Sequence, residues 1–152
     1  MKKIIYTLLV AVLALSFMGC PSVYEERYDY SLGVADIIGD MNGDGAPVTL
    51  NSDGVTYGYK FTYSADMNAW GGKDGTINFK ARSSAGVWDT GICAPKSGDP
   101  LEIGGDYVEC YYRPNEGGAD GANIVVEGLK VGTEYTITFK VEGSNFFVKI
   151  SD

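Results

Sequence analysis

The chain has 152 residues, a formal net charge of −8 and no histidine, so one domain with its own core is the expected organisation. The missing histidine excludes the usual Ser-His-Asp and Cys-His catalytic arrangements. The acidic balance makes nucleic acid and anionic membrane surfaces unsuitable partners. The 21 glycines and the 12% aromatic content favour a sheet protein with many turns.

The first twenty residues have the parts of an export signal. Two lysines form a positive start, residues 4–17 form an apolar run, and Gly19-Cys20 follows at once. The segment resembles a bacterial lipoprotein signal, in which the chain is cut before the cysteine and the cysteine is lipidated. The run is shorter than the roughly 20 residues that cross a bilayer. We therefore expect a signal peptide at 1–19 and lipidation of Cys20, with a plain signal peptide as the alternative.

A polar, tyrosine-rich tether is expected next. Residues 20–31 hold the lipid site and a stretch without helical or strand periodicity. Acidic residues outnumber its single arginine, which disfavours docking on anionic lipid. Residues 32–152 then show neither a repeat nor a linker, so we expect them to form a single domain.

A turn rich in Asp, Asn and Gly follows the first predicted strand, Leu32–Ile38. Asp40, Asn42 and Asp44 alternate before a glycine, which matches the first half of a calcium loop. Asn51 stands where such a loop needs a bidentate glutamate. The same residue types are common in turns for backbone reasons. We favour a turn, with calcium as the only cofactor considered.

Runs bounded by turn residues predict the remaining strands, with period-2 alternation of apolar and polar residues at 55–64, 76–82 and 133–142. They are expected at 55–64, 76–82, 106–113, 122–126, 133–142 and 145–150. Glycine-rich turns separate them, and residues 89–105 look irregular. A chain of about seven to eight short strands is typical of an all-β antiparallel sandwich.

The stretch Thr76–Trp88 is the candidate site. Its apolar positions alternate toward a core, so its other face presents long polar side chains close to Trp88. Those side chains are Asn78, Lys80 and Arg82. A flat aromatic beside hydrogen-bond donors suits a sugar ring, and Trp70, in a glycine-rich loop, is a second candidate anchor. The alternatives are that Trp88 is an ordinary core residue and that Trp70 is a lid over a sheet end.

Two cysteines remain if Cys20 carries lipid. In an exported domain, Cys93 and Cys110 are most simply a disulfide. Closing that loop would stabilise the domain by about 3 kcal/mol in the chain-entropy model. A structural zinc site is not expected, because the domain has only two cysteines and no histidine.

Several short motifs together resemble a known family. They are Gly39-Asp40-Met41-Asn42, Tyr57-Gly58-Tyr59-Lys60-Phe61, Asn78-Phe79-Lys80 leading to Trp88, and Gly132-Thr133-Glu134-Tyr135-Thr136-Ile137-Thr138-Phe139. They resemble the outer-membrane lipoproteins of the SusE/SusF kind and related starch-binding modules. The resemblance covers roughly residues 33–152. It implies an immunoglobulin-like sandwich on a bacterial outer membrane that holds α-glucan on an exposed aromatic platform.

The resemblance also assigns roles to single residues. It implies that Trp88 is the stacking aromatic, that Lys80 is the lysine of the preceding strand, and that Asn123 is the asparagine before the last strands. Family modules often carry a tryptophan after the Gly-Asp-x-Asn turn, where this chain has Gly43-Asp44. Trp70 is the residue that could replace it.

The sequence thus leaves four functions open. The first is a non-catalytic glycan-binding lipoprotein, and the second is a surface lipoprotein that uses the same aromatic loops on a protein partner. A glycosidase would need two facing carboxylates, which the sequence cannot pair. A structural spacer is the fourth.

Overall fold

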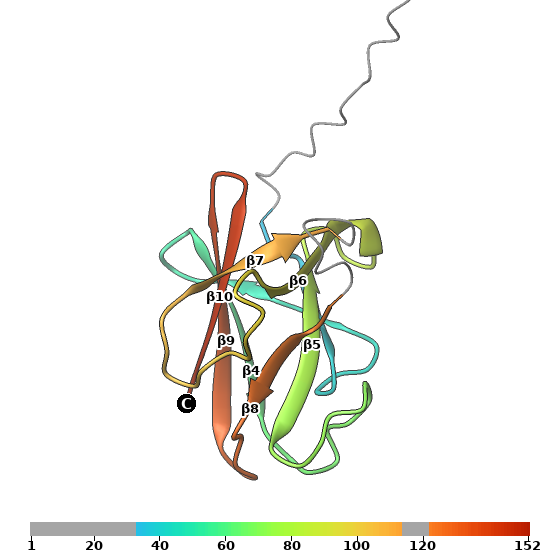
Figure 1. Cartoon of the computed structure of the whole chain (residues 1–152). Coiled ribbons are helices and arrows are strands. Elements are labelled where there is room, and N and C mark those ends of the chain that lie inside the picture. The colour runs from blue at the N-terminus through green and yellow to red at the C-terminus, as the bar shows by residue number, and fades with distance from the viewer. Residues whose placement is uncertain (1–32, 114–121) are drawn as a thin grey trace, which may run out of the picture.

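The computed structural model describes residues 33–113 and 122–152 (Figure 1). The predicted signal peptide, Cys20 and the tether lie outside these ranges, as does Leu32. No helix within the described ranges is long and apolar enough to span a bilayer. The described residues form one unit built almost wholly of strands, so the prediction of an all-β fold is confirmed.

Ten strands of the described residues form a single antiparallel sheet. They are β1 (Asp36–Gly39), β2 (Ala46–Pro47), β3 (Thr49–Leu50), β4 (Thr56–Thr62), β5 (Thr76–Arg82), β6 (Gly91–Pro95), β7 (Val108–Tyr112), β8 (Ile124–Glu127), β9 (Glu134–Glu142) and β10 (Asn145–Ser151). Their order in the sheet is β2-β1-β5-β6-β7-β10-β9-β4-β3, and β8 pairs with β5. In Figure 1, β9 and β10 lie on the left and β5 on the right.

The two ends of this strand order are neighbours in the chain, and the sheet therefore curls nearly into a barrel. The segment 46–50 pairs with β1 through its first half and with β4 through its second half. Between the halves, the amide of Val48 donates to the carbonyl of Ala35 at 3.2 Å. One short segment thus bridges β1 and β4, which leaves few unpaired sheet edges.

The core fills the space between the two sides of the curled sheet. Alternate residues of β5 and β9 point inward, because successive strand residues face opposite ways. The Phe79 and Phe139 rings meet there edge to face, with centroids 6.5 Å apart. Neither is exposed, and their contact joins β5 directly to the opposite side of the core. The inner face of β5 is therefore packed into the core, and its outer face is left for other contacts.

Strand β6 is the main element that the sequence did not predict. Gly91–Pro95 falls inside the stretch 89–105, which we expected to be irregular, yet all five of its residues are buried. A strand buried on both faces has no alternation to read. The two-residue strands β2 and β3 were also missed, because they are too short to show a period.

The predicted disulfide is wrong, since no bond joins Cys93 and Cys110. Both are buried on the neighbouring strands β6 and β7, whose register is irregular between Ile92 and Pro95. A disulfide requires a particular arrangement of the two Cβ atoms, which spacing in the sequence does not reveal. Burial, with smaller contributions from Cys93 and Glu109, raises the pKa of Cys110 to about 12. The Cys110 thiol is therefore a neutral core side chain at physiological pH.

Candidate functional site

The outer face of β5 brings most of the predicted site residues together. Asn78, Lys80 and Arg82 alternate with three buried residues of the same strand, so all three start from one face. Strand β8 runs beside β5 with Phe79 opposite Ile124. Asn123 directly precedes β8, and the same register carried one residue further sets it opposite Lys80. Four of the predicted site positions therefore lie close together on the outer face of β5 and on the neighbouring chain before β8.

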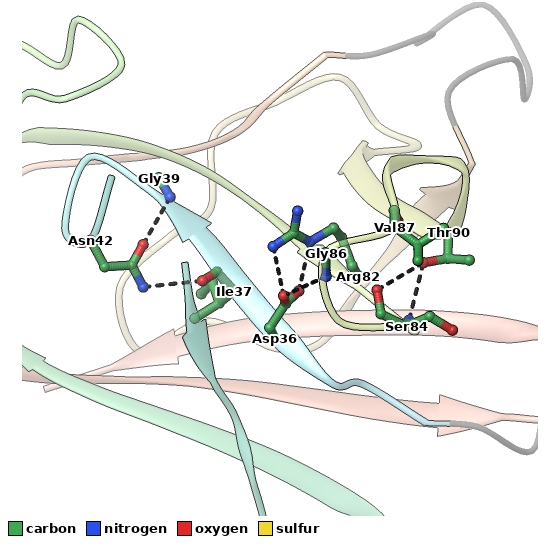
Figure 2. Close-up of polar contacts among 9 residues, drawn as sticks. All are labelled: Asp36, Ile37, Gly39, Asn42, Arg82, Ser84, Gly86, Val87 and Thr90. Atoms are coloured by element: carbon green, nitrogen blue, oxygen red, sulfur yellow. Dashed lines mark hydrogen bonds and ion pairs between the residues drawn. The ribbon is translucent and has the colours of Figure 1, made fainter. Parts of the chain in front are cut away.

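Trp88 is exposed and stands over this face. The chain leaves β5 through a turn at 83–87 and enters a short 3-10 helix, Trp88–Thr90. Thr90 Oγ1 fixes the turn by donating to the Val87 carbonyl at 2.8 Å and accepting from the Ser84 amide at 3.0 Å (Figure 2). Trp88 is 48% exposed. The interpretation of Trp88 as an ordinary core residue is therefore wrong.

Trp70 lies against Trp88, although the two come from different loops. Their ring centroids are 6.1 Å apart and the ring planes are tilted by 34°, a separation within the usual range of aromatic pairs. Trp70 is half-buried. The two indoles make one aromatic surface, which we call the tryptophan pair.

Arg82 supports the tryptophan pair from beneath. Its guanidinium carbon lies 4.8 Å from the centroid of the Trp88 ring, which is a cation–π geometry. Its Nε and Nη2 donate to the two oxygens of Asp36 at 2.8 and 2.6 Å, and the Gly86 amide donates to Asp36 Oδ2 at 3.1 Å (Figure 2). Arg82 is only 5% exposed.

This burial changes the role of Arg82. We expected it to donate to a bound sugar, but its donors face Asp36 and its guanidinium lies under an indole. It therefore orders the site without reaching the surface. The sequence missed Asp36 altogether. The available signal was a carboxylate among apolar residues of a predicted strand, since such a group is buried only with a partner.

Asp40 holds the loop that carries Trp70. Its Oδ1 accepts hydrogen bonds from the amides of Trp70 and Gly72 at 2.6 and 3.2 Å. Its Oδ2 accepts from the amide and the side-chain nitrogen of Asn78 at 2.6 and 3.0 Å. The Asp40 carboxylate is buried, and four N–H groups converge on it. Asn78 is thereby drawn toward Asp40, so its amide nitrogen is engaged within the protein.

The turn that follows β1 uses its oxygens for the backbone. Asn42 Oδ1 accepts from the Gly39 amide at 3.0 Å, and its Nδ2 donates to the Ile37 carbonyl at 3.1 Å (Figure 2). Asp44 is exposed. Within residues 33–113 and 122–152, no three His, Cys, Asp or Glu side chains cluster to hold a metal ion. The geometry favours the turn interpretation over the calcium loop.

Lys80 and Asn123 are the polar residues best placed to meet a ligand. Both are half-buried, and neither side chain makes a hydrogen bond or an ion pair with another described residue. Comparisons of this chain with protein-family models, curated proteins and solved structures gave no match. The resemblance to starch-binding lipoproteins therefore stays a prediction, and the function has to be argued from this surface.

Proposed function

We propose that the domain is a non-catalytic glycan-binding module whose ligand stacks on the tryptophan pair. The observation that carries the proposal is the pairing of Trp70 and Trp88 at 6.1 Å, with Trp88 48% exposed. An isolated exposed tryptophan needs no explanation. Two tryptophans from separate loops, supported by buried charged residues, form a preorganised aromatic surface.

The chemistry of this surface suits a sugar. A pyranose ring has an apolar face that an indole covers, and its rim of hydroxyls needs hydrogen-bond partners. Lys80 supplies donors only, whereas Asn123 supplies both a donor pair and an acceptor. Each such hydrogen bond replaces one to water, so affinity per sugar is expected to be modest.

The two buried carboxylates beneath the tryptophan pair are not available as catalytic groups. A glycosidase needs two carboxyl groups that flank the scissile bond. Asp36 and Asp40 are the buried carboxylates at this surface, and their oxygens already accept from a guanidinium and from amide groups. Neither is presented to a ligand.

The class of glycan and the cellular location are proposed from the sequence. We propose an α-glucan of the starch type as ligand and a bacterial outer membrane as location, with the domain tethered through lipid on Cys20. The resemblance described above supports both. Display at a membrane would let a modest affinity hold a polymer through several copies of the protein.

Affinity electrophoresis tests the proposal. The soluble chain from residue 21 to residue 152 would be run through gels that contain amylopectin, glycogen or a β-glucan. We expect retardation by an α-glucan, lost in Trp88→Ala and weakened in Trp70→Ala. Phe147→Ala is the matched control, because Phe147 is a half-buried aromatic on the outer face of β10 and lies outside the site. It should leave retardation unchanged.

The other outcomes point elsewhere. Equal loss of retardation in the Trp88 and Phe147 variants would show that the tryptophan pair is not the binding site. Absence of retardation in every gel would favour the alternative function, in which the exposed Val87 and Trp88 contact a protein partner. Release of reducing ends from the polymer would instead show catalysis.

A further inference from the structure

Two carboxylates on one face of a single strand each hold one tryptophan loop. Asp36 and Asp40 are four residues apart along β1 and its extension, so they lie on the same face of the strand. Asp36 accepts from Gly86 in the turn before Trp88. Asp40 accepts from Trp70 itself. One short, buried strand therefore anchors both loops, and its geometry determines the separation of the two indoles.

The Trp70 loop depends on Asp40 more than the Trp88 turn depends on Asp36. The Trp88 turn also has the internal bonds of Thr90 and the guanidinium of Arg82. Among the described residues, the hydrogen bonds that join residues 66–73 to a segment distant in the sequence both end on Asp40. Its other backbone hydrogen bonds are local: Met67 to Ser64, Gly71 to Asn68 and Thr76 to Lys73.

We propose that Asp40 is a positioning residue that sets the place of Trp70 against Trp88. Its two carboxylate oxygens bind different segments, because Oδ1 accepts from the loop and Oδ2 accepts from Asn78 on β5. The loop is thus fastened to the same strand that carries Arg82 beneath Trp88. If the function proposed above holds, on which this step rests, Asp40 also sets the affinity for glycan without touching it.

The packing of Gly72 supports the same assignment. A Cβ atom at Gly72 would lie 2.5 Å from Asp40 Oδ2 and 2.8 Å from the Thr76 carbonyl oxygen. Both separations are too short for real contacts, and the second neighbour is backbone. The loop therefore comes so close to the carboxylate that a side chain at this position would push it away. Gly72→Ala therefore perturbs the contact between the Trp70 loop and the Asp40 carboxylate without changing Asp40 itself.

The experiment measures the tryptophan pair directly and needs no ligand. Two indoles in close contact give a coupled circular-dichroism signal, an exciton couplet, which depends on their mutual orientation. The full-length chain in detergent would be compared with Asp40→Asn and Gly72→Ala, and Trp88→Ala would define the signal without a pair. Asp44→Asn is the matched control, since it makes the same chemical change in the same turn at an exposed residue.

We expect Asp40→Asn and Gly72→Ala to lose most of the couplet and Asp44→Asn to keep it, with cooperative thermal melts in all. An unchanged couplet in folded Asp40→Asn overturns the proposal. If that variant fails to fold, Gly72→Ala decides. If neither folds, Asp40 is a general structural residue and the proposal fails as well.

Glycan binding supplies the second measurement. In gels that retard the parent chain, Asp40→Asn should raise the dissociation constant for glycan roughly tenfold. In a chain that already carries Trp70→Ala, the same change should not raise the dissociation constant further. A further loss there would show that Asp40 acts by another route than Trp70. If the parent chain binds no glycan, the proposed function fails, while the couplet still tests the positioning role independently.

Discussion

Arg82 is the residue on which the exposed surface and the interior both depend. It carries a full charge while 5% exposed, and its partner Asp36 is 7% exposed. A buried ion pair offsets the cost of removing two charges from water only when its geometry is good. Here the pairing is bidentate, and the guanidinium also lies against the Trp88 indole. Its loss would leave an uncompensated carboxylate beneath the site.

Replacing Arg82 by glutamine should therefore destabilise the domain by about 3 kcal/mol or more, because the buried Asp36 charge loses its partner. Chemical denaturation followed by fluorescence measures the change. Lys60→Gln is the control, since the Lys60–Glu134 pair is exposed to water on both sides and should contribute less than about 1 kcal/mol. Similar losses in the two variants would contradict a special role for Arg82.

Single residues show where sequence reasoning succeeds and where it stops. Alternation along β5 was enough to put Asn78, Lys80 and Arg82 on one face. It could not tell that Arg82 would be buried, because its partner Asp36 lies 46 positions away. The resemblance offered Trp70 as a second tryptophan of the platform, but alternation could not show its contact with Trp88, since that contact follows from how two loops fold onto β1.

At the scale of elements, the turn after β1 shows how one pattern serves two chemistries. Alternating oxygen-bearing residues before a glycine can bind calcium. The same residues are common in turns, where their side chains form hydrogen bonds with backbone groups. The difference lies in what the oxygens contact. Asp40 and Asn42 accept from N–H groups, which point positive charge at the oxygens and leave them poorly placed for a cation.

We therefore expect calcium to leave the stability of the domain unchanged. A bound ion would raise the melting temperature in proportion to its occupancy of the folded state. Thermal melts in millimolar calcium and in excess chelator should have coincident midpoints. Asp44→Asn should also melt at the same temperature in both buffers. A higher midpoint in calcium that Asp44→Asn abolishes would establish the calcium loop instead.

The long strands were predictable because they alternate, and the short ones were not. β9 and β10 appeared close to their observed limits, since one face of each is buried and the other is largely polar. β6 lacks that contrast because it is wholly buried. The disulfide failed for a related reason: cysteine spacing carries no information on how two neighbouring strands turn their side chains.

At the scale of the whole molecule, closure of the sheet is the feature that no local pattern contains. β2 and β3 are two residues each and mostly exposed, yet together they join β1 to β4. β9, in contrast, is paired along both edges by β4 and β10. Stability should therefore be uneven, with a firm wall at β4, β9 and β10 and a weak seam at 46–50.

Native-state hydrogen exchange should detect this seam. The Val48 amide makes its bond to Ala35 in a short, exposed segment, so local opening should release it at a small fraction of the unfolding free energy. The Ile137 amide lies in a strand with neighbours on both sides and should exchange only by global unfolding. Equal protection at Val48 and Ile137 would mean that the seam opens only when the whole sheet does. In that case the barrel would be a single cooperative unit, and the strand β1 that anchors both tryptophan loops would be as rigid as the core.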